Sequence, residues 1–308
     1  MRCGFLPALS CFLLMSFYMP AVLHAQDNPH ADSLMAQLDE ALSVKQGHIP
    51  VSSTFKATRI GNTQSVKNVG RGVLDFEVSH RFGTLNQGFH SFFGLDNAVT
   101  KLNFDYGLTD WLTIGAGRST YEKQYDGMLK LRLLQQTTDD HMPVSLSYVG
   151  AFYVQSMDMP DMPNGDAYLF TNRITYLNQL LIARKFNRLI SLQLMLTHLH
   201  FNIVPTTVEP NNVYAAGLGG RIKISNRMAL IGEYHYQLPE HKLEGFHNSL
   251  SVGLAIETGG HVFQLLFSNS AAINMPVAIG KSADSWAHGG IHFGFNLSRV
   301  FTVARPKS

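Results

Sequence analysis

From residue 72 to residue 301 the chain alternates apolar and polar residues in segments that are each about ten residues long. In the first segment, Leu74 and Phe76 fall on one face of an extended strand, and Asp75 and Glu77 fall on the other, because strand side chains alternate with period two. One face favours lipid and the other favours water. This pattern predicts an all-β fold, an up-and-down antiparallel transmembrane β-barrel.

Alternation and turn residues predict about twelve strands. The predicted strands span residues 72–82, 98–106, 112–121, 127–136, 144–154, 167–185, 189–201, 212–223, 228–238, 247–257, 261–270 and 286–301. Short and longer connections alternate between them. Short turns at one end, longer loops at the other and an even number of strands are typical of outer-membrane barrels, whereas a β-sandwich has no reason to sort its connections this way.

The N-terminus has the layout of an export signal. A basic residue, Arg2, precedes an apolar run that ends near Ala25, which predicts a secretory signal peptide over residues 1–25 and export to the bacterial outer membrane. Beyond this run, no apolar stretch reaches the roughly 18 residues that a spanning helix requires. Both cysteines, Cys3 and Cys11, lie within the predicted signal, so the mature chain has no thiol chemistry.

Three further parts are predicted after the signal. Residues 26–53 are expected to form a periplasmic extension with a short helix, because Leu34, Leu38 and Leu42 repeat every four residues. Residues 54–303 are expected to form the barrel, followed by a tail over 304–308. Two interpretations of residues 51–60 stay open, a further strand or a segment folded into the lumen. The role of the helix is also open.

The inward face of the barrel is where function is expected, because charged side chains avoid the lipid. Fifteen polar residues are predicted to line the lumen: Asp75, Glu77, Arg81, Lys101, Asp105, Lys130, Arg132, Arg221, Lys223, Glu233, His235, Glu257, Gln264, His292 and Asn296. Two interpretations compete. The groups form a salt-bridged network that fills the interior, or they line a hydrated pore, since about twelve strands fall between a filled barrel and an open channel.

The sequence gives little evidence for a catalytic site or a metal site. His80 lies on the apolar face of its strand, where a histidine is unexpected, but Ser79 points the other way and no triad is visible, so no catalytic residue and no enzyme are predicted. Met157, Met159 and Met162 are soft copper(I) ligands in an outer loop, and His198 and His200 share one face. Neither set has supporting ligands, so no metal and no cofactor are predicted.

Several motifs in order carry a resemblance to a known family. They are GVLDFEVSHRFG, FGLDNAV, YGLTDWLTIGAGRS, QLLIARKF, ETGGHVFQLLFSNS and IHFGFNLSRVF. Together they resemble an uncharacterised outer-membrane β-barrel family of Bacteroidota, domain of unknown function 5777, over roughly residues 54–303. The resemblance implies outer-membrane placement and no established activity.

The predicted function is that of a narrow passive channel or binding barrel for small polar solutes. The alternative is a closed structural or docking barrel without transport, and an outer-membrane hydrolase is the least favoured hypothesis. The expected partners are outer-membrane lipid, the barrel-insertion machinery during biogenesis and a small polar solute, with the protein as a monomer. A formal net charge of +2 gives no argument for nucleic acid.

Overall fold

The computed structural model describes residues 48–158, 169–204 and 209–304. These residues belong to one compact unit that begins at His48. The predicted signal peptide, the predicted helix near Leu38 and most of the methionine-rich loop lie outside the described residues. No helix in the described part of the chain is both long and apolar enough to cross a membrane.

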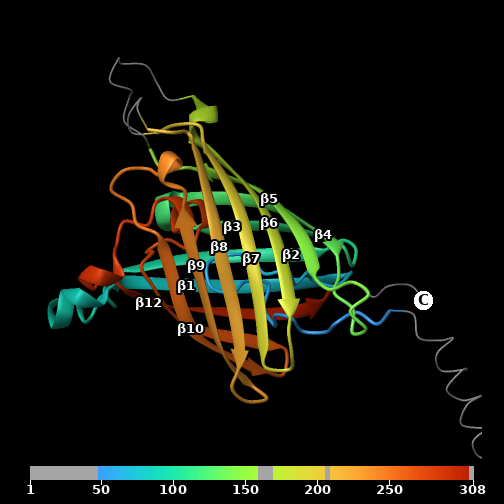
Figure 1. Ribbon diagram of the computed structural model, residues 1–308. Helices are drawn as coiled ribbons and strands as arrows, with labels where there is room; N and C mark the ends of the chain where they lie inside the picture. The colour runs from blue at the N-terminus through green and yellow to red at the C-terminus, as the bar shows by residue number, and fades with distance from the viewer. Residues whose placement is uncertain (1–47, 159–168, 205–208, 305–308) are drawn as a thin grey trace, which may run out of the picture. The chain divides into compact units, whose positions relative to one another are not determined.

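Twelve antiparallel strands in the described residues close into a barrel, in which each strand pairs with its neighbours in sequence and β1 pairs with β12 (Figure 1). The strands are β1 (Val73–Thr84), β2 (Ala98–Gly107), β3 (Leu112–Ser119), β4 (Gln124–Leu134), β5 (Ser145–Gln155), β6 (Ile174–Lys185), β7 (Ile190–Phe201), β8 (Asn212–Lys223), β9 (Met228–Gln237), β10 (Ser249–Thr258), β11 (His261–Ser268) and β12 (His292–Thr302). This architecture confirms the predicted fold class and topology.

Two predicted strands begin too early. The strand predicted from residue 167 starts at Ile174, because the 3-10 helix η3 (Phe170–Arg173) precedes it. The strand predicted from residue 286 starts at His292, after the 3-10 helix η5 (Trp286–His288). Trp286 is therefore not part of a strand, and its indole donates a hydrogen bond to the Leu250 carbonyl, 2.9 Å away.

The two ends of the barrel differ in their connections. Four turns at one end, after β2, β6, β8 and β10, are only two to four residues long, whereas the connection between β11 and β12 at the other end runs from residue 269 to residue 291. That long loop contains the helix α2 (Met275–Gly280). The remaining loops of this end carry the 3-10 helices η1 (Leu85–Ser91), η2 (Tyr121–Lys123) and η4 (Pro239–His241).

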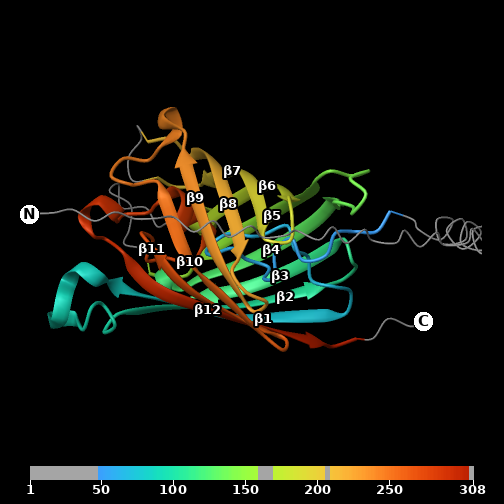
Figure 2. The ribbon, with the colours of Figure 1, turned by 60° about the horizontal axis from the view of Figure 1, so that its bottom comes forward.

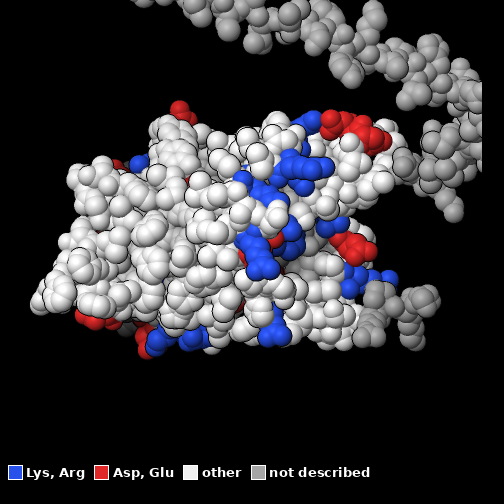
Figure 3. All heavy atoms as spheres, turned by 90° about the horizontal axis from the view of Figure 1, so that it is seen from below, with Lys and Arg blue, Asp and Glu red and all other residues white. Residues whose placement is uncertain are grey.

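The outward face of the strands is apolar. Leu102, Phe104, Leu129, Leu194 and Leu196 are all exposed on the outside of the barrel, as the alternation predicts. Figure 3 shows one face, on which Lys and Arg side chains gather in a band to the right of centre and a broad, largely uncharged area lies to its left. An uncharged outer belt is what contact with a bilayer requires.

Residues 54–69 fold into the barrel as a hairpin, which we name the inner hairpin (Figure 2). Arg59 and Gln64 bridge its two arms, and the turn lies at residues 60–63. Before the hairpin, Pro50 pairs with Thr137 in the β4–β5 connection, and after it Arg71 pairs with Gly107 at the end of β2. The hairpin therefore enters and leaves at the same end, the end with the short turns.

The lumen is polar on only part of its wall. On β5 to β8 the inward side chains are mainly apolar, and they form a buried core with Phe55, Ile60 and Val66 of the inner hairpin and with α2. The wall residues of this core include Val149, Tyr153, Leu177, Leu181, Met195, Leu199, Phe201 and Val213. The expectation that the inward face of every strand meets water is therefore wrong for β5 to β8, because their inner face packs against the chain's own segments.

Candidate functional site

The tip of the inner hairpin is held by the carboxylate of Glu233 on β9. The Asn62 amide N–H donates to Glu233 Oε1 over 2.6 Å, and the Thr63 hydroxyl donates to Oε2 over 2.5 Å. Asn62 Nδ2 also donates to the Ser251 hydroxyl on β10, 3.0 Å away. Arg81 on β1 also binds the tip, because its Nη2 donates a hydrogen bond to Asn62 Oδ1 over 2.7 Å. These four hydrogen bonds join the tip to β1, β9 and β10.

Arg59 of the inner hairpin lies among carboxylates of β1 and β2. Its Nε is 2.9 Å from Glu77 Oε1 and its Nη2 is 3.9 Å from Asp105 Oδ2, and all three side chains are buried. The Nε–H is not aligned for a hydrogen bond, so the contact is an ion pair. Burial acts to lower the pKa of Arg59, but the carboxylates of Glu77 and Asp105 outweigh it and raise this pKa above its ordinary value.

Lys130 on β4 anchors the returning arm of the hairpin. Its Nζ donates to Gln64 Oε1 over 2.7 Å, to the Ser65 carbonyl over 3.2 Å and to the Lys67 carbonyl over 2.7 Å. An ammonium group has three donors, so this fully buried side chain is satisfied. The contact therefore meets the requirement that a buried charge be hydrogen-bonded.

Amide side chains of the barrel wall also bind the backbone of the inner hairpin. Gln264 on β11 donates to the carbonyls of Arg59 and Ile60, each over 3.1 Å. Asn296 on β12 donates to the Gly61 carbonyl over 2.8 Å. Gln193 on β7 accepts from the Val66 N–H over 2.8 Å and donates to the Gln64 carbonyl over 2.8 Å. These contacts satisfy hairpin backbone groups that no strand partner serves.

Nine of the fifteen predicted lumen residues contact the inner hairpin. They are Asp75, Glu77, Arg81, Asp105, Lys130, Glu233, Glu257, Gln264 and Asn296.

The other six predicted residues are Lys101, Arg132, Arg221, Lys223, His235 and His292, and their surroundings differ. Lys101 pairs with Asp126 over 2.8 Å, Arg221 pairs with Glu257 over 2.8 Å, and His292 lies 2.9 Å from Asp284. His235 is buried without a hydrogen-bond partner in the described residues. Arg132 and Lys223 bond to the nearby side chains of Gln135 and Asn226, close to the short-turn end.

Sequence reasoning missed several residues of this site. Asn62, Thr63 and Arg59 lie in a segment without strand alternation, so no pattern aims their side chains. Gln193 and Asp126 could have been predicted as lumen residues, since each occupies an inward position of its strand. Gln193, for example, lies between the inward residues Ser191 and Met195. The candidate site is therefore formed by side chains of the barrel wall together with residues of the inner hairpin.

A family model described as a membrane-bound beta barrel domain, DUF5777, matches residues 55–301. The chain belongs to this family. Its matched region contains nearly the whole inner hairpin as well as all twelve strands described above, so the hairpin is part of the DUF5777 domain. The description places the barrel in a membrane, in agreement with the apolar outer wall.

Solved barrels with low sequence identity are also similar to this DUF5777 chain. The NanC porin is 9% identical, covers 74% of this chain and 98% of its own, and gives a TM-score of 0.45. A KdgM porin in complex with disordered oligogalacturonate is 7% identical, with coverages of 74% and 99% and a TM-score of 0.45.

An outer membrane channel from Pseudomonas putida F1 is 12% identical, with coverages of 76% and 97% and a TM-score of 0.47. None of the curated proteins compared with the chain matches it. These structural likenesses are distant, and the fold assignment stands on the strand pairing of the DUF5777 barrel itself.

His80 does not have the surroundings of a catalytic base. It lies on the outside of the DUF5777 barrel, stacked against Phe295 of β12 with ring centroids 5.1 Å apart, and its ring nitrogens contact the Thr100 hydroxyl. Ser79 points into the barrel and donates to Glu77 Oε1 over 3.0 Å. The histidine is thus a contact at the β1–β12 seam.

The histidine pair on β7 also has a structural role. His198 Nε2 and His200 Nδ1 both contact Asn212 Oδ1 on β8, at 2.9 and 2.8 Å. Among the described residues, no group of three or more His, Cys, Asp or Glu side chains is arranged to hold a metal ion. The charged interior of the DUF5777 barrel is thus the candidate functional site, and its chemistry is that of hydrogen bonding and ion pairing.

Proposed function

We propose that the protein is an outer-membrane channel for small polar solutes and that the inner hairpin holds it closed in the conformation described here. The observation that carries the proposal is the course of the hairpin, which enters and leaves the lumen at one end. A hairpin inserted in this way withdraws without threading a chain end through the barrel. Its departure removes the segment that occupies the middle of the lumen.

The placement in an outer membrane is supported by the connections. Short turns at one end, a long loop at the other and an even number of strands are the features of bacterial outer-membrane barrels. In such barrels the short turns face the periplasm. The inner hairpin would then be inserted from the periplasmic side.

The polar wall residues that bind the hairpin are evidence for a water-filled path through the lumen once the hairpin has left. Glu233, Lys130, Gln264 and Asn296 bind the hairpin through polar groups, and water can replace each of these partners when the hairpin leaves. Closed barrels of eight strands are filled by side chains and those of sixteen strands hold an aqueous channel, so twelve strands suit a narrow pore. A narrow, polar pore would pass small polar solutes.

A closed structural barrel is the second candidate, and the apolar side of the hairpin favours it. Ile60 is buried against Gly219 and Met195, and Phe55 and Val66 belong to the same core. Withdrawal exposes these side chains, which costs free energy in proportion to the apolar area that meets water. A permanent hairpin would make the barrel a rigid membrane scaffold.

Solute flux into liposomes separates the two candidates. The test compares the wild-type chain with a variant in which a short Gly-Ser linker replaces residues 54–69. A channel closed by the hairpin predicts slow entry of a small sugar for the wild type and fast entry for the variant. If the variant folds as a barrel and still admits no sugar, the proposed channel is wrong.

A further inference from the structure

The outer wall of the barrel carries a groove that crosses β5 to β8 and ends at Leu238, just after β9. It lies toward the ends of the strands that carry the long loops. The groove has a volume of about 360 Å³, within the range of roughly 300–1,000 Å³ that holds small ligands. Its lining is almost entirely apolar, and it contains no Lys, Arg, Asp or Glu.

Two rows of outward side chains run across the groove. Asn178, His198 and Tyr214 are paired neighbours on β6, β7 and β8, and they form a polar row. Leu180 and Leu196, followed by Ala216, form the next row, which lies farther from the long-loop end. The groove is thus polar near the membrane surface and apolar deeper in the wall.

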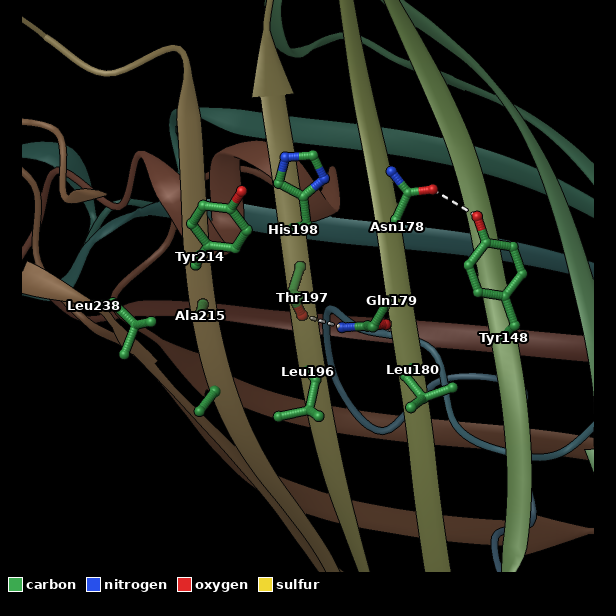
Figure 4. Close-up of a pocket in the computed structure, with 11 residues that line it drawn as sticks. Tyr148, Asn178, Gln179, Leu180, Leu196, Thr197, His198, Tyr214, Ala215 and Leu238 are labelled. Atoms are coloured by element: carbon green, nitrogen blue, oxygen red, sulfur yellow. Dashed lines mark hydrogen bonds between the residues drawn. The ribbon is translucent and has the colours of Figure 1, made fainter. Parts of the chain in front are cut away.

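Asn178 is an unusual residue on a wall that faces lipid. Its Oδ1 accepts a hydrogen bond from the Tyr148 hydroxyl over 2.5 Å, whereas its Nδ2 has no partner in the described part of the chain. Figure 4 shows the amide nitrogen turned away from Tyr148, while the neighbouring Gln179 points inward and bonds to Thr197. Because Asn178 is exposed in the polar row near the membrane surface, its Nδ2 is open to an acceptor from outside the chain.

We propose that the groove binds one acyl chain of a membrane phospholipid. The ester carbonyl at the head of the chain accepts a hydrogen bond from Asn178 Nδ2, and the methylenes run past Leu180 and Leu196 over Ala216. Three observations point to this ligand: the Asn178 Nδ2 donor is open, the polar row lies nearer the membrane surface than the apolar row, and the family is membrane-bound. The absence of basic residues in the lining favours a neutral ester over a phosphate group.

The size of Ala216 gives the groove its depth. Ala216 faces Leu196 on β7 and Tyr236 on β9, so a methyl group stands where the neighbouring strands carry large side chains. A thin chain fits such a depression, whereas the convex wall of a second barrel would not reach its floor. The proposal rests on membrane placement and holds whether or not the barrel conducts.

Native mass spectrometry of the full chain tests the proposal, with the detergent-solubilised protein titrated with palmitoyl-oleoyl phosphatidylethanolamine. Ala216→Phe fills the groove and Asn178→Leu removes the amide donor, and both keep an uncharged outer wall. Ala116→Phe is the matched control, because Ala116 is an exposed outward alanine on β3, away from the groove. The wild type and the control should each retain one lipid.

The occupancy of the bound lipid should fall by about fivefold in Asn178→Leu, as expected for the loss of one hydrogen bond, and further in Ala216→Phe. Equal retention by all four proteins would overturn the proposal. So would a wild type that binds lipopolysaccharide in place of the phospholipid, or one that forms a dimer which Ala216→Phe dissociates. Heat-modifiability on gels confirms that each variant is folded before the titration.

Discussion

Arg59 Nε in the inner hairpin lies 2.9 Å from Glu77 Oε1 on β1, and each side chain is less than 5% exposed. This ion pair joins a segment that precedes the barrel to the first strand of the barrel, deep inside the lumen. Two carboxylates, those of Glu77 and Asp105, face the one guanidinium. The hairpin thus supplies a positive charge to these two carboxylates of the wall.

Arg59→Met should destabilise the barrel strongly. Removal of one partner from a buried ion pair leaves an uncompensated charge, which typically costs about 3–5 kcal/mol. Lys56→Met is the control, because Lys56 pairs with Glu257 at 3.1 Å and is 39% exposed, so its loss should cost at most about 1 kcal/mol. Urea unfolding in detergent measures both. Equal losses of unfolding free energy would contradict the importance of the Arg59 site.

Glu233→Gln should loosen the tip of the hairpin. The carboxylate accepts from Asn62 and Thr63 with both oxygens, and a glutamine keeps only one acceptor oxygen. In an Ile60→Cys background, which keeps the Thr63 hydroxyl, a water-soluble thiol reagent should then label residue 60 about tenfold faster, as expected for a charged hydrogen bond worth roughly 1.5 kcal/mol. Glu244→Gln is the control, since Glu244 is exposed in an outer loop. An unchanged labelling rate would show that Glu233 does not hold the tip.

Gly219→Val should displace the hairpin without touching its polar contacts. A Cβ atom at Gly219 would collide with Ile60 Cδ1, whereas the adjacent Gly220 faces outward, where the nearest side chain is that of Leu192. The collision should raise liposome flux, and Gly220→Val should leave it at the wild-type level. Faster flux in Gly220→Val alone would argue against the hairpin as the closing element.

A barrel that lacks the hairpin should prefer cations. The linker variant loses the positive charge of Arg59 beside Glu77 and Asp105, while Arg81 and Lys130 remain on the wall. The charge balance of the lumen therefore shifts toward negative, which attracts cations. Reversal potentials across a salt gradient should show cation preference in the linker variant. Adding Glu77→Gln and Asp105→Asn should remove it. Anion preference in the linker variant would show that solutes pass along another part of the wall.

The wall could be predicted from the sequence, whereas for residues 51–60 the sequence left a further strand and a segment folded into the lumen both open, and it did not indicate a hairpin. On β1 and β2 apolar and polar residues must alternate, because a one-residue slip would turn Asp75 or Lys101 toward hydrocarbon. Residues 54–69 face no lipid, so nothing forces a period on them. Their position depends on partners such as Glu233 and Gln193 that lie far away in sequence.

The apolar interior of β5 to β8 did leave a signal in the sequence. On β7, the outward Leu194 and Leu196 flank the inward Met195, and the inward Leu199 follows, so the strand is apolar on both faces. A strand of this kind is expected where both faces are covered. This pattern indicates that chain segments occupy that side of the lumen, although it does not identify them.

Single-channel conductance in planar bilayers tests the closing role of the hairpin most directly. The wild-type chain should insert and remain silent for most of the time, and the variant with a Gly-Ser linker in place of residues 54–69 should show a steady current at the same potential. A folded linker variant that inserts without current, or a wild type with the same steady current, would contradict the account.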